Sequence, residues 1–215
     1  MIKLFSDFNA EAVVLAAGDF PQHPFPLQLL QEARRVVCCD GAAAAFVSRI
    51  QRAPWRIVGD GDSLPQRLKE QYAEALTIVA EQETNDLTKA TLFLERQGIR
   101  RIAYLGATGK REDHALGNIS LLADYAQRGL EVRMLTDYGI FIPCRGTTHC
   151  QAPVGTQVSI FAFGATQLRS EGLRYALHDL TNWWQGTLNE VTASDFTIHA
   201  DGCYLIYAAY AAGGR

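Results

Sequence analysis

The first 136 residues alternate between short apolar runs and longer segments of mixed polarity. The apolar runs predict strands at residues 12–17, 35–39, 56–58, 77–80, 101–105 and 131–136. The segments between them predict helices at residues 27–33, 42–50, 65–75, 85–97 and 112–128. This alternation predicts a mostly parallel sheet with helices on both faces. We therefore expect a Rossmann-like α/β layer, although no G-x-G-x-x-G motif follows the first strand.

The pattern changes after about residue 138, where helical periodicity disappears. Residues 147–151, 157–163 and 197–207 are typical of strands, with glycines and prolines between them. The sequence thus predicts an α/β domain over residues 1–138 and a small all-β sandwich or barrel over residues 139–215. A β domain of this size has a marginal core, so we expect it to pack on its neighbour or on another subunit.

Composition narrows the functional class only slightly. The hydrophobic fraction of 48% and the charged fraction of 20% are ordinary for a globular protein. A formal net charge of −3 gives no electrostatic reason to expect nucleic acid or a membrane as partner. No apolar run is long enough to span a bilayer, and the N-terminus lacks the pattern of a signal peptide. The five cysteines follow no zinc-site spacing, and they fit a reducing cytoplasm.

Two acidic residues separated by one glycine follow the third predicted strand, in Gly59-Asp60-Gly61-Asp62-Ser63. Carboxylates at this spacing repel each other unless a positive group lies between them. Mg²⁺ is the natural candidate, because it prefers oxygen ligands and is commonly held by one or two carboxylates plus substrate phosphates. The alternative is a polar turn in which Asp62 or Ser63 caps the next helix.

Other acidic residues also follow strand ends. In open parallel sheets, ligands bind beyond the carboxyl ends of the strands. Five aspartates follow four such ends, namely Asp40, Asp60, Asp62, Asp86 and Asp113. Lys89 shares the first helical turn with Asp86, and residues 106–111 form a glycine-containing loop that opens a helix and ends in Arg111. Together these residues predict a site for a metal ion and phosphate groups.

Each of these residues also has a structural explanation when taken alone. Asp86 could cap a helix, Lys89 could be solvated, and Asp113 could form a surface ion pair with Arg111. His114 could be a core histidine bonded to Asn118. The convergence of all of them on one edge of the sheet favours the functional interpretation.

Five segments of the chain resemble the thiamine pyrophosphokinase family. They are Asp40-Gly41, residues 59–63, residues 85–90, residues 106–114 with Asn118, and residues 170–175 followed by residues 186–190. Each segment is weak evidence alone, but all five occur in the family's order and spacing over residues 39–190. The resemblance implies transfer of a diphosphate group from ATP to thiamine, with release of AMP. It also implies Mg²⁺ as cofactor, a C-terminal β-sandwich, and a homodimer with active sites at the interface.

The resemblance also implies roles for individual residues. The catalytic set is Asp60, Asp62, Asp86, Asp113, Lys89 and Arg111, with Asp60, Asp62 and Asp86 as metal ligands. The substrate-binding set is Asp40, Thr88, Thr108, Gly109, His114, Asn118, Ser170, Tyr175 and Asn189. Tyr175 matches the position of an aromatic residue that stacks on the thiamine ring. Asp86 and Asp113 are the candidates for the general base.

The sequence departs from the family pattern at two positions. Leu188 stands where the family has a serine before the asparagine, so one hydrogen bond to thiamine is absent. Lys110 stands where the family often has glycine. Two alternatives remain open at this point: a pyrophosphokinase for another alcohol, such as a hydroxymethyl pterin, and a non-catalytic thiamine or nucleotide sensor.

Overall fold

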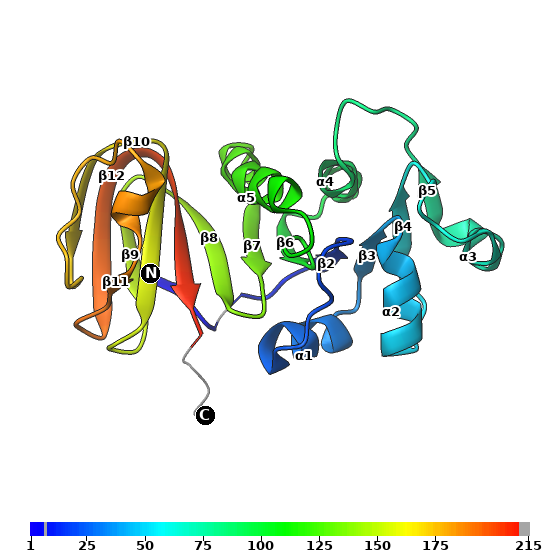
Figure 1. Cartoon of the computed structure of the whole chain (residues 1–215), viewed down its shortest axis with the longest axis horizontal. Helices are drawn as coiled ribbons and strands as arrows, with labels where there is room; N and C mark the ends of the chain where they lie inside the picture. The colour runs from blue at the N-terminus through cyan, green and yellow to red at the C-terminus, as the bar shows by residue number, and fades with distance from the viewer. Residues whose placement is uncertain (7, 211–215) are drawn as a thin grey trace. The chain divides into compact units, whose positions relative to one another are not determined.

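The structure is a computed structural model that describes residues 1–6 and 8–210 (Figure 1). The chain divides into two compact units. Unit 1 comprises Met1–Phe8, Leu122–Gly129 and Tyr138–Arg215, and unit 2 comprises Asn9–Leu121 and Leu130–Asp137. The N-terminal residues therefore group with the C-terminal segment in unit 1.

Unit 2 is built on a parallel sheet of six strands. They are β2 (Ala12–Leu15), β3 (Val36–Cys39), β4 (Arg56–Gly59), β5 (Leu76–Ile78), β6 (Arg101–Leu105) and β7 (Glu131–Leu135). Their order is β7-β6-β2-β3-β4-β5, and each neighbouring pair is parallel. All residues of β2 and β3 are buried, because helices cover both faces of this part of the sheet.

The helices of this part of the chain connect successive strands. They are α1 (Pro24–Glu32), α2 (Ala42–Ile50), α3 (Gln66–Gln71), the 3₁₀ helix η1 (Ala73–Ala75), α4 (Asp86–Arg96) and α5 (Glu112–Gln127). Helices α1 and α2 lie on one side of the sheet and α4 lies on the other (Figure 1). Asn85 caps α4 by accepting a hydrogen bond from the backbone N–H of Thr88 at 2.9 Å.

Two predicted helices differ from the observed ones. Helix α1 begins at Pro24, three residues before the predicted start, because prolines are tolerated in the first turn and the side chain of His23 caps it. The helix predicted over residues 65–75 is interrupted at Tyr72, whose φ of −116° departs from helical geometry, so α3 and η1 are separate.

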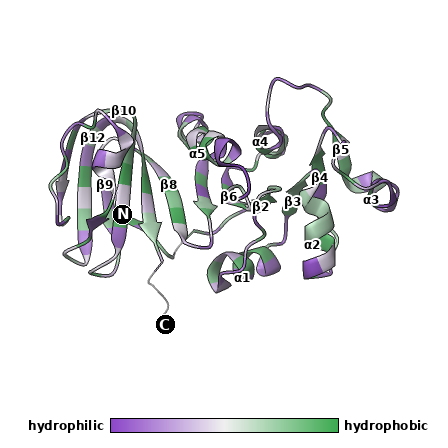
Figure 2. Cartoon of the chain, in the orientation of Figure 1, coloured by the Kyte–Doolittle hydropathy of each residue, from purple (hydrophilic) through white to green (hydrophobic). Residues whose placement is uncertain are grey.

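Unit 1 contains the remaining strands. They are β1 (Ile2–Lys3), β8 (Gly139–Arg145), β9 (Thr148–Gln151), β10 (Gln157–Glu171), β11 (Asn189–Glu190) and β12 (Asp195–Ala209), with the 3₁₀ helix η2 (Trp183–Gly186). Strand β12 pairs antiparallel with β8, β9 and β10, and β10 also pairs with β11. Only β1 and β9 form a parallel pair among the described strands of this unit. Hydrophobic and polar residues alternate along β10 and β12, as expected of strands with one buried face (Figure 2).

The molecule is thus a mixed α/β protein with mixed strand pairing. The prediction of an all-β C-terminal domain is not confirmed in that form, since unit 1 also holds the C-terminal part of α5, from Leu122, and the 3₁₀ helix η2. Strand β8 was not predicted. Within the described part of the chain, none of the helices combines the length and apolar character needed to cross a membrane.

Candidate active site

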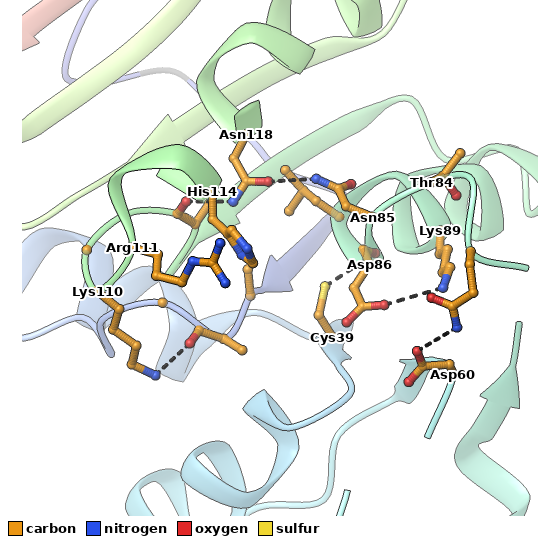
Figure 3. Close-up of a pocket in the computed structure, with 17 residues that line it drawn as sticks. Cys39, Asp60, Thr84, Asn85, Asp86, Lys89, Lys110, Arg111, His114 and Asn118 are labelled. Carbon is orange, nitrogen blue, oxygen red and sulfur yellow. Dashed lines mark hydrogen bonds and ion pairs between the residues drawn. The ribbon is translucent and has the colours of Figure 1, made fainter. Parts of the chain in front are cut away.

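A cavity of about 370 Å³ opens in unit 2, at the carboxyl ends of its strands. Its walls come from the segments that follow β2, β3, β4, β5 and β6. Of the residues predicted for the site, the following line this cavity: Asp60, Asp86, Lys89, Gly109, Arg111, His114 and Asn118 (Figure 3). The others predicted in this unit lie outside the lining: Asp40, Asp62, Thr88, Thr108 and Asp113.

Lys89 and Asp86 form the charged wall on α4. They are three residues apart, so both project from the first turn of the helix, and Lys89 Nζ lies 3.8 Å from Asp86 Oδ1. Only 3% of Lys89 is exposed. Burial raises the pKa of the Asp86 carboxyl, the charges of Asp40 and Asp60 raise it further, and Lys89 partly offsets them. The structure therefore places a buried ammonium group beside a carboxylate that is held near other carboxylates.

Asp60 and Asp62 lie two residues apart in the turn after β4, but only Asp60 lines the cavity. The backbone N–H of Asp62 donates to Asp60 Oδ1 at 3.0 Å, and Gln82 Nε2 donates to Asp60 Oδ2 at 3.1 Å. These two hydrogen bonds lower the pKa of Asp60. Asp60 is therefore an ionised carboxylate at neutral pH whose orientation is fixed by its neighbours.

Asp40 directly follows β3 in a strained conformation, with φ of +29°. Its Oδ2 accepts a hydrogen bond from the backbone N–H of Ser63 at 2.7 Å, which ties β3 to the turn that carries Asp60. Its Oδ1 is buried and has no hydrogen-bond partner among the described residues. Burial raises the pKa of Asp40, and the charges of Asp60 and Asp62 add to the effect. Asp40 thus stabilises the turn that carries Asp60 through its hydrogen bond to Ser63, although it does not line the cavity itself.

These acids have the chemistry expected around a divalent cation. Asp40 has a buried oxygen without a hydrogen-bond partner among the described residues, and the charges of Asp40, Asp60 and Asp86 repel one another. A cation between these side chains would bind the oxygen and reduce the repulsion. As they stand, however, no three His, Cys, Asp or Glu side chains among residues 1–6 and 8–210 are grouped in the geometry of a metal site.

The loop after β6 forms the opposite wall. Arg111 lines the cavity, and its guanidinium group also pairs with Asp113, with Nε 3.0 Å from Oδ1. This pairing lowers the pKa of Asp113 to about 2. Asp113 Oδ1 accepts a further hydrogen bond from the backbone N–H of His114 at 2.9 Å. The structure therefore places Asp113 as a partner of Arg111, outside the cavity lining.

Asn118 on α5 connects the start of α4 with the loop after β6. Its Oδ1 accepts from Asn85 Nδ2 at 2.9 Å, and its Nδ2 donates to the carbonyl of Ala107 at 2.8 Å. The side chain of Asn118 therefore bonds to Asn85 and Ala107, and not to His114 as the alternative interpretation expected (Figure 3). Lys110 bends away from these residues and donates to the carbonyl of Ala17 at 2.6 Å.

Several residues that line the cavity were not predicted from the sequence. Gln82 and Thr84 lie in the polar connector before α4, which shows no periodicity to draw attention to it. Ala17 and Gly18 come from the loop after β2, which also carries Asp19, and this strand end was not predicted to belong to the site. Two signals were available: Asp19 follows this strand in the sequence, and β2 lies between β3 and β6 in the sheet.

Gly18 allows two loops of the cavity to meet, and its replacement by alanine is expected to destabilise the protein. A Cβ atom there would lie 2.2 Å from the Thr108 carbonyl oxygen and 2.5 Å from that of Gly106. Both are backbone atoms, so we expect Gly18→Ala to lower the free energy of unfolding by about 1–3 kcal/mol in urea denaturation. Gly117→Ala is the control, because its Cβ would meet nothing within 4 Å in α5. It is expected to stabilise the protein by about 0.5–1 kcal/mol, and equal stability of the two variants would contradict this account.

The remaining predicted residues lie in unit 1. Ser170 Oγ accepts a hydrogen bond from the backbone N–H of Leu177 at 3.0 Å. The ring of Tyr175 is largely exposed, whereas Asn189 is buried. The amide of Asn189 bonds to both the N–H and the carbonyl of Tyr175. The structure therefore joins Tyr175 and Asn189 in one arrangement within this unit.

In unit 2, the cavity combines a buried lysine, an arginine, fixed carboxylates and a glycine-containing loop at a helix start. This is the chemistry of a site for a phosphorylated ligand. Two family models match the chain in succession: the thiamin pyrophosphokinase catalytic domain over residues 26–134 and the thiamin pyrophosphokinase substrate-binding domain over residues 139–207. The chain belongs to the thiamin pyrophosphokinase family.

Individual relatives agree with this assignment. The chain is 32% identical over 152 residues to Thiamine pyrophosphokinase 1 of Oryza sativa subsp. japonica, a match that covers 60% of this chain and 56% of the rice protein. The fold is similar to that of thiamine pyrophosphokinase from Bacillus subtilis, with a TM-score of 0.76, 20% identity, and coverage of 92% of this chain and 98% of that one. It is also similar to the Candida albicans protein, with a TM-score of 0.77, 17% identity, and coverage of 98% and 92%.

Proposed function

We propose that this protein transfers the terminal diphosphate of ATP to the hydroxyl group of thiamine, giving thiamine diphosphate and AMP. The observation that carries the proposal is the match of a catalytic and a substrate-binding family model, in that order, to one chain. The thiamine hydroxyl oxygen would attack the β-phosphorus, and the bond from this phosphorus to the bridging oxygen of AMP would break. The hydroxyl proton would pass to a base.

The residues of the cavity support roles in binding the triphosphate. Lys89 is buried and faces Asp86, so its charge is poorly screened by water and suits the β- and γ-phosphates. Arg111 would add a planar cation, held in orientation by Asp113. The backbone of the loop at Gly109 offers N–H groups to phosphate oxygens at the start of α5. Little covalent chemistry is then required of the protein beyond positioning and charge stabilisation.

Asp86 is the better candidate for the base. Its carboxyl lines the cavity, whereas that of Asp113 lies outside the lining, and a general base must lie within reach of the proton that it accepts. Asp113 has a pKa of about 2 and is committed to Arg111. We therefore assign Asp113 to the positioning of Arg111.

The family needs a divalent metal ion, and we propose Mg²⁺. Asp60 and Asp86 would hold it from the cavity, and Asp62 and Asp40 would complete the acidic surroundings. When bound, Mg²⁺ neutralises charge on the phosphate oxygens. The unpartnered Oδ1 of Asp40 and the repulsion among these acids support this assignment.

We further propose a Rossmann-like ATP-binding domain within residues 1–138, built on the parallel strands of unit 2, and a β-sandwich over residues 139–215 that binds thiamine and forms a homodimer. Parallel pairing in unit 2 and mostly antiparallel pairing in unit 1 support the division. Exposed aromatic and apolar side chains of unit 1, at Tyr175, Trp184 and Leu188, support an interface there. The five cysteines are buried and form no disulfide within the described residues, which supports a reducing compartment such as the cytoplasm.

Tyr175 would stack on the cationic ring of thiamine, since an aromatic face attracts cations. We expect Tyr175→Ala to weaken thiamine binding about tenfold, through loss of stacking area and of the cation–π contact, and to change ATP binding less than twofold. Isothermal titration with each ligand measures both effects. Tyr175→Phe keeps the ring and is expected to bind thiamine almost as well as the wild type. Equal losses for both ligands would instead assign Tyr175 a packing role.

The proposed function is tested by incubating the purified protein with ATP, Mg²⁺ and thiamine, and by measuring AMP and thiamine diphosphate. We expect both products, and no AMP when thiamine is omitted. If AMP formed only with a different alcohol, such as a hydroxymethyl pterin, that alcohol would be the substrate in place of thiamine. If the protein bound thiamine and ATP but formed no product, it would be a non-catalytic sensor of these ligands.

A further inference from the structure

Asn189 is buried in unit 1, and its side-chain amide is committed to main-chain groups. Only 3% of the residue is exposed. Its Oδ1 accepts hydrogen bonds from the backbone N–H of Tyr175 at 3.0 Å and of Glu190 at 2.9 Å, and its Nδ2 donates to the Tyr175 carbonyl at 2.7 Å. A primary amide offers two donor hydrogens and two acceptor lone pairs. Three of these four positions are therefore used within the protein, including both lone pairs.

These hydrogen bonds extend an antiparallel pairing between two segments. Leu173 forms a bridge with Val191, and the backbone N–H of Arg174 donates to the Glu190 carbonyl at 2.9 Å. At the next step, the side chain of Asn189 replaces the main chain as the partner of Tyr175. The backbone of Asn189 is itself paired with Val158 of β10. Tyr175 is thus fastened through Asn189 to a long strand of the sheet.

The side chain is needed because the main chain turns away at Leu188. This residue has φ of +60°, a left-handed conformation that is unfavourable for leucine, and its N–H donates to Ser159 Oγ at 3.3 Å. Leu188 is 76% exposed, so burial of its side chain does not explain the strained conformation. The turn ends the backbone pairing at the point where the Asn189 amide takes over.

Tyr175 is consequently fixed at its main chain and open at its ring. Both of its backbone polar groups bond to Asn189, whereas 60% of the residue remains exposed. Arg174 lies with Cζ 6.0 Å from the ring centroid and pairs with Glu190 at 3.1 Å. An exposed aromatic ring on an immobilised backbone loses little conformational entropy when a flat ligand stacks on it.

We propose that Asn189 is a positioning residue that locks the main chain of Tyr175, so that the tyrosine ring is preorganised for a cationic heteroaromatic ring, and that it does not contact the substrate itself. The proposal rests on the proposed function. It replaces the substrate-binding role that the family resemblance implied for Asn189.

The test is a double-mutant cycle on thiamine binding, measured by isothermal titration for the wild type, Asn189→Asp, Tyr175→Ala and the double variant. Aspartate is nearly isosteric and keeps both acceptor bonds, but it places an oxygen against the Tyr175 carbonyl. We expect Asn189→Asp to raise the Kd for thiamine about tenfold and to leave the Kd for ATP within twofold. The new negative charge alone would attract the cationic ligand, so weaker binding cannot be a simple charge effect.

The cycle separates positioning from contact. If Asn189 acts only through Tyr175, the double variant binds thiamine no more weakly than Tyr175→Ala alone. Additive losses would make Asn189 a direct ligand and overturn the proposal, as would an unchanged Kd in Asn189→Asp. A wild-type protein that does not bind thiamine would overturn the proposed function as well.

Hydrogen exchange of the wild-type protein keeps the proposal testable if Asn189→Asp does not fold. The Tyr175 amide is expected to exchange as slowly as the Arg174 amide, which bonds to the Glu190 carbonyl. Exchange of the Tyr175 amide at the rate of an unprotected loop would show that Asn189 does not hold the main chain of Tyr175, and this result would overturn the proposal without any ligand-binding measurement.

Discussion

Asp86→Asn is expected to lower kcat/KM for thiamine about a thousandfold. Asp86 lines the cavity, carries the candidate base, and is one of the two cavity carboxylates proposed to hold Mg²⁺. Asparagine keeps the size of the side chain but removes both its charge and its basicity. Loss of a general base or of one charge-stabilising group each costs about 10²–10³-fold, and here both depend on one side chain. Initial rates of AMP formation at varied thiamine concentrations measure the effect.

Glu95→Gln is the matched control for this variant. It removes the same charge from the same helix, outside the cavity lining, where Glu95 faces Arg100 at 3.9 Å. Its rate is expected to stay within twofold of the wild type. Circular dichroism and the thermal midpoint should show that both variants are folded. If Asp86→Asn kept a tenth or more of the wild-type activity, neither the metal role nor the base role of Asp86 would stand.

Lys89→Met is expected to lower kcat/KM for ATP about a hundredfold. Methionine retains most of the aliphatic volume of the buried side chain, so the change removes mainly the ammonium charge that faces Asp86. A cation with so little exposure to water contributes strongly to stabilising phosphate charge in the transition state. The thiamine Kd should change much less, because Lys89 is assigned to the phosphates.

Arg96→Met controls for the loss of one positive charge from α4, since Arg96 is exposed in the last turn of the helix. It is expected to leave both substrates' kinetic constants within twofold. If Lys89→Met left kcat/KM for ATP unchanged, or lowered it no more than Arg96→Met does, Lys89 would not stabilise the phosphates.

Much of the fold of unit 2 could be predicted from the sequence, because buried parallel strands are continuous apolar runs and the connecting helices have a different periodicity. The predicted range of β6 and that of α2 agree with the structure. Unit 1 was harder. Strand β10 continues for eight residues past the predicted end at Phe163, because Gly164 forms a bulge and does not end the strand. Strand β8 contains Pro143, which argues against a strand in sequence patterns, yet it pairs with Leu205 of β12.

The candidate site was predictable to the extent that topology places strand ends together. The sequence identified Asp60, Asp86, Lys89 and Arg111, which all line the cavity. It could not show which carboxylates face inward, because that depends on local hydrogen bonds. The Asp62 backbone turns towards Asp60, and Asp113 is occupied by Arg111. The interpretation of Asn189 as a ligand had the same weakness, since its burial and its three hydrogen bonds are properties of the folded chain.

The central claim is that a diphosphate group moves as one unit to thiamine. The most direct test uses ATP labelled separately at the β- and γ-phosphates and follows both labels into products with the wild-type protein, Mg²⁺ and thiamine. We predict that both labels appear in thiamine diphosphate in equal amounts and that AMP is released unlabelled in a one-to-one ratio. Transfer of the γ-label alone, with labelled ADP as co-product, would contradict the account.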